Sequence, residues 1–410
     1  MSALAVTARE PGAVRAADHA ALVGGRPPAA GRGPRRPQLT VDLDAVAHNV
    51  RLFAERAGGG LMAVVKADGF GHGGVAIART AVENGATWLG VTSIEEGLDL
   101  RAEGVDVRIL SWLNTVDADF PTALAADIDL AVPSREHLDA VVAATGSRYG
   151  VRRRARVHLH VDCGMARDGA PVPMWASLCR AARDAERLGL IEVVAVMGHL
   201  GCADDPADRC NELGRACFED AVVVAALAGL HPSEQHLAAT AATLADRRTH
   251  RTMCRVGAGL VGIDPTRTAG LRPALTLRAS VVGVRDIPAS TAVGYGHSWR
   301  APAPTRCALV PLGYADGLPL AASNRAAMWV RGRRCPVVGR ISMDQTVLDV
   351  GDLPVRPGDE VVAFGPGTVG EPTVAQWAGW AATIEHEIVT GIGARVERVV
   401  LPATPRGCAS

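Results

Sequence analysis

The hydrophobic pattern between residues 41 and about 260 alternates between two kinds of segment. Amphipathic stretches with apolar residues near i, i+3, i+4 and i+7, typical of helices, separate short β-rich runs. Eight such runs occur, at 61–66, 87–92, 107–112, 128–132, 156–161, 191–198, 234–238 and 252–256. Eight strands alternating with helices predict an α/β fold, a closed parallel (β/α)8 TIM-like barrel, with an open doubly wound sheet as the alternative.

The pattern changes after about residue 270. Strand-like segments interrupted by Pro and Gly follow one another, and only the stretch near 373–390 has a helical period. This predicts a mostly β C-terminal domain over residues 271–405, after a barrel over residues 38–270. The first 37 residues are rich in Gly, Pro, Ala and Arg without periodicity, which predicts a disordered N-terminal tail.

Composition narrows the possible partners. The 410 residues include 43 basic and 43 acidic ones, so net charge favours neither nucleic acid nor an anionic membrane. Apolar residues make up 48%, and no apolar run approaches a membrane span, which indicates a soluble protein. Small molecules are the expected partners.

The nine cysteines are odd in number and never form C-x-x-C. Their spacing therefore indicates neither a disulfide framework nor a zinc site, so no metal is expected. A reducing cytoplasm fits this usage best.

Polar residues stand at the ends of the predicted barrel strands, where such barrels carry their chemistry. The loops after the last two strands form the usual phosphate site of this architecture, and the Thr240 hydroxyl and the backbone N–H groups of Gly257 and Ala258 could donate there. A phosphorylated ligand is implied. The strand-end residues are Lys66, His160, Asp162, His199, Thr240 and Arg255.

Lys66 ends the apolar run "LMAVVK" and enters the glycine-rich loop "ADGFGHGG". A lysine in a barrel mouth beside a phosphate site could form a Schiff base with a carbonyl, since burial and nearby cations lower its pKa. Pyridoxal 5'-phosphate offers both an aldehyde and a phosphate. A lysine extended to solvent and a Schiff-base aldolase both remain open at this point.

Seven motifs follow one another in the sequence: "AVVKADGFGHG", "VDCGMARDG", "GHLGCAD", "RVGAGLVGID", "VGYGHSW", "PLGYADG" and "VGRISMDQ". In this order they resemble the motifs of bacterial alanine racemases, and the resemblance covers about residues 38 to 403. The resemblance implies a fold-type III pyridoxal-phosphate enzyme, a racemase (isomerase) that interconverts L- and D-alanine, makes D-alanine for cell-wall precursors, and works as a head-to-tail homodimer with shared active sites.

The resemblance also implies roles for individual residues. Lys66 would hold the cofactor and act as one acid/base, and Tyr295 of the second subunit would act on the opposite face of Cα. Arg255 would face the pyridine nitrogen and keep it largely unprotonated, which favours proton exchange over transamination or decarboxylation. His199 would lie near the ring.

The remaining implied roles concern the phosphate and the substrate. Thr240, Gly257, Ala258 and His386 would bind the phosphate. Arg167, the backbone of Met343, and Tyr314 would bind or border the substrate, while Arg340 would line the entry and Asp344 would orient its neighbours.

Four positions depart from the family pattern. Phe70 and His386 replace tyrosines that bind the phosphate, His160 replaces a lysine that positions the arginine at 167, and Ala239-Thr240 replaces Asn-Ser. These changes leave alternatives: a fold-type III epimerase or decarboxylase acting on another amino acid, or a catalytically weak paralogue that binds pyridoxal phosphate.

Overall fold

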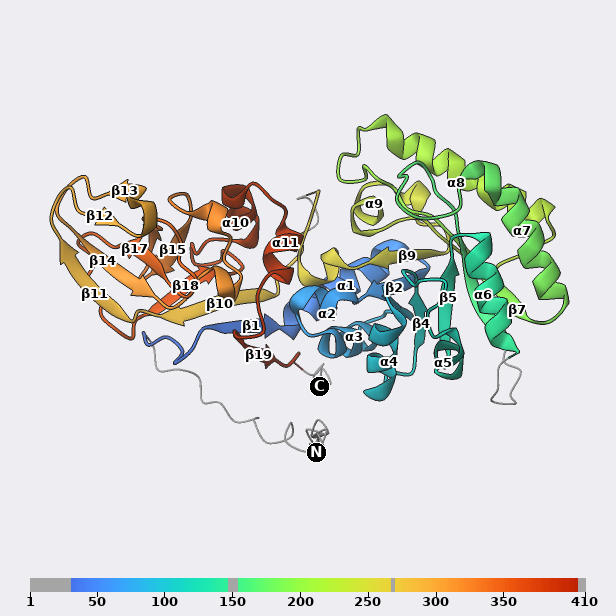
Figure 1. Cartoon of the computed structure of the whole chain (residues 1–410), viewed down its shortest axis with the longest axis horizontal. Coiled ribbons are helices and arrows are strands. Elements are labelled where there is room, and N and C mark those ends of the chain that lie inside the picture. The colour runs from blue at the N-terminus through green and yellow to red at the C-terminus, as the bar shows by residue number, and fades with distance from the viewer. Residues whose placement is uncertain (1–30, 147–153, 267–269, 405–410) are drawn as a thin grey trace, which may run out of the picture.

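The computed structural model describes residues 31–146, 154–266 and 270–404. Two domains lie side by side, an α/β domain and a mostly β domain (Figure 1). The predicted fold class is confirmed: each of the eight predicted runs contains a parallel strand. The barrel strands are β2 (Gly60–Val64), β3 (Trp88–Val91), β4 (Arg108–Ser111), β5 (Ile128–Val132), β6 (Ala155–His160), β7 (Ile191–Met197), β8 (Glu234–His236) and β9 (Met253–Val256).

The barrel closes between its two last strands. The ladder runs β8-β7-β6-β5-β4-β3-β2-β9, so β8 and β9 stand at its two ends. The Thr252 amide donates to the Gln235 carbonyl at 3.1 Å, and the Arg255 amide donates to the Ala238 carbonyl at 2.9 Å. These bonds join the ends of the sheet and bring the loops after β8 and β9 to one edge of the barrel mouth.

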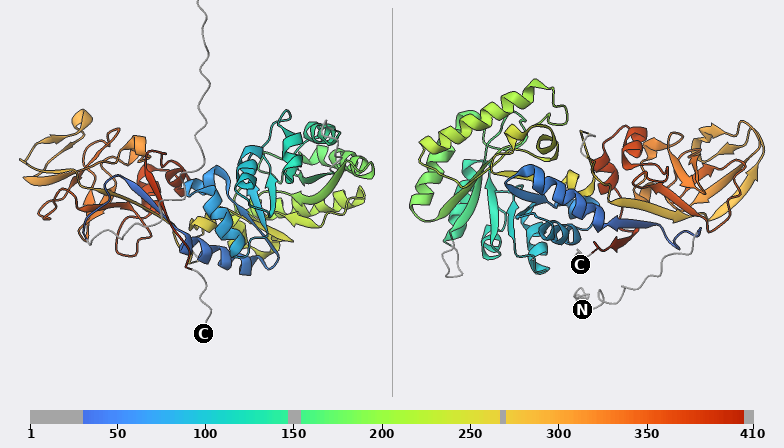
Figure 2. Two further views of the ribbon diagram at one scale, coloured as in Figure 1. Left: turned by 90° about the horizontal axis from the view of Figure 1, so that it is seen from below. Right: turned by 180° about the vertical axis from the view of Figure 1, so that it is seen from behind.

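Helices cover the outside of the barrel strands (Figures 1 and 2). Several begin at a side-chain cap, such as Ser93 before α4 and Ser134 before α6, which satisfies amides of the first turn. The helical elements of this domain are α1 (Leu43–Ala57), α2 (Lys66–Gly71), α3 (Gly74–Glu83), α4 (Ile94–Ala102), α5 (Phe120–Ala125), α6 (Arg135–Thr145), α7 (Val172–Arg187), α8 (Arg209–Leu227), α9 (Thr240–Ala245), η1 (Arg247–Thr249) and η2 (Ala258–Val261).

The second domain is built from three sheets. A six-stranded sheet contains β16 (Arg333–Pro336), β15 (Ala327–Val330), β18 (Glu360–Phe364), β10 (Leu275–Ser280), β1 (Gln38–Asp42) and β19 (Glu397–Leu401), in that order. The smaller sheets contain β11 (Gly283–Ile287), β14 (Thr305–Val310) and β17 (Thr346–Asp349), and β12 (Ala292–Val293) with β13 (Trp299–Arg300). The short helical turns are η3 (Tyr295–His297), η4 (Tyr314–Asp316) and η5 (Leu320–Ala322).

The helical stretch predicted near 373–390 is present as two helices, α10 (Val374–Ala381) and α11 (Glu385–Thr390). Helix α11 packs against α2 of the barrel domain, and Figure 1 shows it between the two domains. No helix among the described residues is both long and apolar enough to cross a membrane.

The N-terminal boundary differs from the predicted one. Strand β1 pairs antiparallel with β10 and parallel with β19, so residues 38–42 belong to the C-terminal sheet although the sequence pattern assigned them to the barrel. The disordered tail predicted for residues 1–37 falls mostly on residues 1–30, outside the described part. Residues 33 and 34 are bonded to the second domain, through Gly33 N to Gly358 O (3.0 Å) and Ser280 Oγ to Pro34 O (2.7 Å), which corrects the prediction for this end of the tail.

Candidate active site

Lys66 lies just beyond the end of β2, at the start of a left-handed turn. The four residues after it, 67–70, have φ between 51° and 60°. For Ala, Asp and Phe this conformation costs roughly 1–2 kcal/mol per residue. Side-chain bonds hold the turn: the Ala67 amide donates to Glu96 Oε1 at 2.7 Å, and Asp68 Oδ1 accepts from the Gly74 amide at 2.6 Å. Strain of this kind concentrates at functional sites, where the surrounding structure can hold it.

A cavity of about 650 Å³ opens beside Lys66 at the C-terminal end of the barrel strands. It brings together residues from the ends of several strands and from helix α11 of the second domain. The sequence-predicted residues that line it are Lys66, Arg167, His199, Thr240, Arg255, Gly257, Ala258 and His386.

The Lys66 amine is tuned by its surroundings. Burial lowers the pKa of Lys66, and the positive charge of Arg167 lowers it further, against an opposing effect of Glu96. A lowered pKa increases the fraction of neutral amine, which is the form that attacks a carbonyl or accepts a proton.

Arg255 is buried at the base of the cavity and most of its guanidinium protons are already bonded. Its Nη1 donates to the His236 carbonyl (2.7 Å) and to His236 Nδ1 (2.9 Å). Its Nη2 donates to the Gly198 carbonyl (2.7 Å) and lies 3.2 Å from His199 Nδ1. The N–H left over is on Nε, which has no bonding partner within the described parts of the chain. Burial lowers the pKa of Arg255 to about 10, so the group stays charged at neutral pH.

A buried hydrogen-bonded chain runs from Arg255 into the barrel. Arginine can only donate, so His236 Nδ1 must accept and His236 Nε2 must carry the proton. That N–H faces His158 Nδ1 at 2.8 Å, which leaves the second proton on His158 Nε2, 3.3 Å from Asp129 Oδ2. Arg108 also donates to this carboxylate, at 2.6 Å. Burial lowers the pKa of both histidines, and the charge of Arg255 adds to the effect on His236, so the surroundings favour the neutral form of both rings.

Thr240 lines the cavity beside the loop after β9 and organises that loop. Its Oγ1 accepts from the amides of Gly257 (3.4 Å) and Gly259 (3.2 Å), so its own O–H is left to donate elsewhere. Both glycines are required by close packing: a Cβ on Gly257 would meet Phe70 Cζ at 2.7 Å, and one on Gly259 would meet the Phe53 ring at 2.4 Å.

His386 completes this end of the cavity from helix α11. Its ring centroid lies 6.0 Å from that of Phe70. Its Nδ1 is buried and has no partner among the described residues. Burial lowers the pKa of His386, and the charge of Lys66 lowers it further. A neutral ring with a free buried nitrogen is suited to a polar ligand group.

These features fit pyridoxal phosphate. Lys66 offers an amine whose pKa is lowered, and the Nε–H of Arg255 suits an unprotonated ring nitrogen. The Thr240 hydroxyl and the free nitrogen of His386 can meet a phosphate. The sequence analysis predicts that the Gly257 N–H binds the phosphate, but in this structure it donates to Thr240 Oγ1.

The residues expected to meet a substrate carboxylate lie on the loop after β6. Arg167 is exposed at the edge of the cavity. His160 contacts the neighbouring Asp168, with Nδ1 3.4 Å from Oδ2, and no hydrogen bond joins it to Arg167 within the described ranges. Burial tends to raise the pKa of Asp168, but the neighbouring His160 outweighs this effect, and the pKa is lowered.

Three sequence-predicted residues lie outside this cavity, on the second domain. Tyr295, Tyr314 and Met343 are 71%, 44% and 53% exposed. They belong to neighbouring loops: the Tyr314 amide donates to the Ser342 carbonyl, and a Cβ on Gly294 would lie 3.3 Å from the Arg340 amide. Figure 1 shows β12 and β13, which flank Tyr295, on the side of this domain remote from the barrel.

The sequence reasoning missed the buried chain of His236, His158 and Asp129. A signal was present in "RVHLHV", because polar residues at every second position of a strand point to one face. In a closed barrel that face is the interior. The three residues lie on three separate strands, so no single segment of the sequence indicates the hydrogen bonds that connect them to Arg255.

A lysine and a charged arginine at the mouth of a (β/α)8 barrel, followed by a β domain, define the class of barrel-type pyridoxal-phosphate enzymes. The profile of the alanine racemase N-terminal domain matches residues 41–265, and that of the alanine racemase C-terminal domain matches residues 274–400. The chain belongs to the alanine racemase family, which confirms the resemblance carried by its motifs.

Individual relatives agree over nearly the whole length. A protein named alanine racemase from Frankia casuarinae is 46% identical over 367 residues, covering 87% of this chain and 94% of that protein. The crystal structure of alanine racemase from D-cycloserine-producing Streptomyces lavendulae is 42% identical, with a TM-score of 0.88, covering 90% of this chain and 98% of its own. A structure from Bartonella henselae, described with covalently bound pyridoxal phosphate, is 26% identical with a TM-score of 0.81, covering 90% of this chain and 100% of its own.

Proposed function

We propose that this protein is a pyridoxal-phosphate-dependent racemase that interconverts L- and D-alanine, and that its D-alanine serves cell-wall precursors. The observation that carries the proposal is the pairing of Lys66 with Arg255 in one cavity. The first offers an amine with a lowered pKa, and the second a single free N–H in the same cavity. The names of the relatives supply the substrate.

Lys66 would have two tasks. It would hold the cofactor covalently when no substrate is present, and as a free amine it would take or return the proton at one face of the substrate Cα. When bound, pyridoxal phosphate supplies a carbonyl carbon for an amino group and a conjugated ring that stabilises a carbanion. Arg167, at the cavity edge, would pair with the substrate carboxylate.

Arg255 would favour racemisation over competing reactions. Its Nε–H can only donate, so the ring atom opposite it must be an unprotonated acceptor. By keeping the ring nitrogen unprotonated, Arg255 would make the bound cofactor a weaker electron sink, which would favour return of the proton to the substrate Cα. A decarboxylase would gain from a carboxylate at this position, and none faces Arg255 Nε among the described residues.

A second acid/base must act on the opposite face of Cα, and we infer that it is Tyr295 of a second subunit. The exposed group formed by Tyr295, Tyr314 and Met343 supports this inference, because none of the three lines the cavity of its own chain. A head-to-tail dimer would place this group over the partner's barrel mouth and complete both sites. A cytoplasmic location is part of the proposal, supported by the described cysteines, all of which are free thiols.

The test is incubation of the purified protein with L-alanine in deuterated water. Loss of the Cα proton signal by NMR, together with D-alanine detected by chiral chromatography, is the expected result. Borohydride reduction and peptide mapping should place the cofactor on Lys66, and Lys66→Ala is the control. Exchange with another amino acid and none with alanine would refute the substrate assignment.

A further inference from the structure

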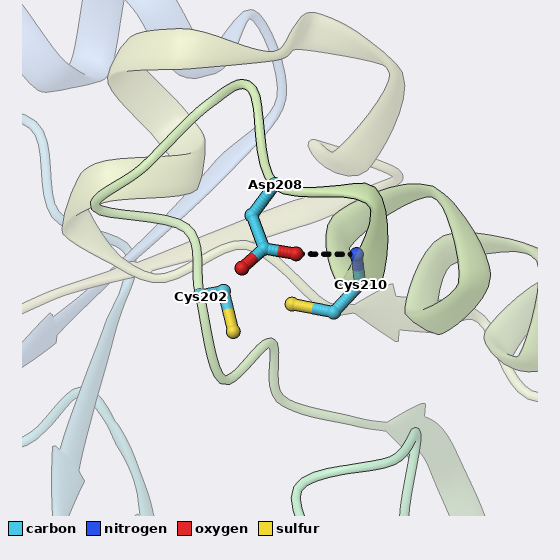
Figure 3. A group of neighbouring side chains, drawn as sticks. All are labelled: Cys202, Asp208 and Cys210. Atoms are coloured by element: carbon cyan, nitrogen blue, oxygen red, sulfur yellow. Dashed lines mark hydrogen bonds between the residues drawn. The ribbon is translucent and has the colours of Figure 1, made fainter.

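Two cysteines and a carboxylate meet outside the cavity described above, in the loop between β7 and α8. Cys202 lies in the loop, Asp208 caps α8, and Cys210 lies in the first turn of that helix. Their ligand atoms all lie within 4.8 Å of one another. Figure 3 shows both sulfurs and the carboxylate turned toward the same space.

From these three residues we propose a metal site, which would take one soft divalent cation of the zinc type. Two thiolates and a carboxylate oxygen form a donor set that Zn²⁺ prefers, with a fourth position left for water. Around a tetrahedral ion with Zn–S bonds of about 2.3 Å, neighbouring ligand atoms lie about 3.8 Å apart. The observed spacing therefore needs only a small contraction.

Hydrogen bonds hold the segments that carry the three residues in place. Asp208 Oδ1 accepts from the Cys210 amide at 2.8 Å, which fixes the carboxylate against the helix. Asn211 Nδ2 donates to the carbonyls of Cys202 (3.1 Å) and Asp205 (2.9 Å), and so ties the loop to the same helix. The three ligands thus come from two segments that the protein itself holds together, which lowers the entropy cost of binding an ion.

Two thiols and a carboxylate are groups that bind a cation once they are deprotonated. Metal binding would release one proton from each thiol and replace it with a metal–sulfur bond, so that the ion neutralises the two thiolates.

A route for the ion is present as well. Asp208 lines a cleft of about 410 Å³ between α8 and α9, which Glu212 and Asp246 also line. Two arginines, Arg209 and Arg248, border the same cleft, and Arg248 is paired with Asp246 at 2.9 Å. The cleft gives solvent access to the carboxylate.

A disulfide is the competing use of the same sulfurs. It would form by loss of two hydrogens to an oxidant such as a peroxide, and it would not need Asp208. The convergence of the carboxylate with both sulfurs favours the metal. Cys202 follows His199 by three residues, so a metal here would tether the loop that carries this cavity residue to α8.

The experiment uses the full-length protein loaded with its cofactor, in a buffer with a phosphine reductant. Equilibrium dialysis against micromolar Zn²⁺, followed by elemental analysis, should give one zinc ion per chain. Binding should protect two thiols from a thiol-specific reagent. Asp208→Asn keeps a helix cap and should weaken zinc binding by at least about tenfold. The Cys202→Ser/Cys210→Ser double variant should lose it.

The matched control is Cys217→Ser, on the same helix but outside the cluster, which should bind zinc as the parent does. Absence of stoichiometric zinc in the reduced parent would overturn the proposal. So would equal zinc binding by the double variant, because the ion would then sit elsewhere. A reduced protein that binds no zinc but on mild oxidation becomes lighter by two hydrogens, with Cys202 joined to Cys210, would assign the pair to a disulfide. If the serine variants fold poorly, Asp208→Asn alone decides between these outcomes.

Discussion

Two single variants, Lys66→Ala and Tyr295→Phe, test whether each catalytic site draws on two chains. Within one chain Lys66 lines the barrel cavity, whereas Tyr295 lies between β12 and β13 on the side of the second domain remote from it (Figure 1). A dimer of either variant therefore contains no complete site. Since a positioned acid/base group contributes about 10²–10⁴-fold, each variant alone should lose activity by at least that factor.

A mixed dimer of the two variants should recover activity. One of its sites combines the intact Lys66 of one chain with the intact Tyr295 of the other, and its second site lacks both groups. Random pairing of equal amounts gives about half mixed dimers, each with one good site of two. The expected recovery is therefore about a quarter of the parental rate, and about half for mixed dimers isolated with two different affinity tags.

The assay measures D-alanine formed from L-alanine after the two variants are co-expressed. The matched control pairs Lys66→Ala with Arg255→Ala, because both changes lie in the barrel and no mixed dimer can then assemble a complete site. Isolated mixed dimers that stay as inactive as their parents would refute the shared site. Equal recovery in the control would refute it too.

Three further predictions concern the cofactor, the loop after β6 and the buried histidines. Phe70→Tyr should tighten pyridoxal-phosphate binding about 10–100-fold, because the ring edge of residue 70 borders the Gly257 loop and a hydrogen bond to a charged group is worth roughly 1.5–3 kcal/mol. The measurement is the dissociation constant from titration of the protein stripped of cofactor, and an unchanged constant would mean that residue 70 does not face the phosphate. Activity should not respond to bicarbonate through His160, since histidine does not form a lysine-type carbamate, and a response lost in a His160 variant would contradict this. Burial lowers the pKa of His72 to about 4 and that of His199 to about 3. In the unfolded chain both pKa values are near 6.5, so between these limits the unfolded state binds more protons than the folded state. The free energy of unfolding, measured with urea, should therefore fall as the pH drops from about 6.5 to about 4, by on the order of 3 kcal/mol for His72 alone, and a rise would refute the assignment.

The barrel strands could be predicted because each is a local feature. A strand buried on both faces is a short apolar run, and the helix after it has apolar residues at the helical spacing. Eight repeats of this strand–helix unit identify the fold. Strand β1 could not be placed in this way. Its partners are residues 275–278 and 397–401, and nothing in residues 38–42 themselves distinguishes pairing with those segments from pairing inside the barrel.

The candidate site was predictable where one strand end delivers one functional group, as for Lys66 and Arg255. The conformation of residues 67–70 was not predictable, because Ala, Asp and Phe all disfavour a left-handed turn. Contacts with Glu96 and Gly74 hold it against local preference. Tyr295, Tyr314 and Met343 show a different limit. The family motifs identify them, but one chain alone leaves them exposed, so their role depends on an interface that a single sequence does not describe.

Hydrogen bonds inside the barrel hold the Arg255 guanidinium in place. Asp129 and Arg108 lie at one end of the buried chain, and His158 and His236 connect them to the guanidinium. Because the pKa of Arg255 is about 10, the guanidinium keeps its proton at neutral pH and would supply none to the ring nitrogen of a bound cofactor. In the proposed reaction, proton transfer would then take place at the two faces of the substrate carbon.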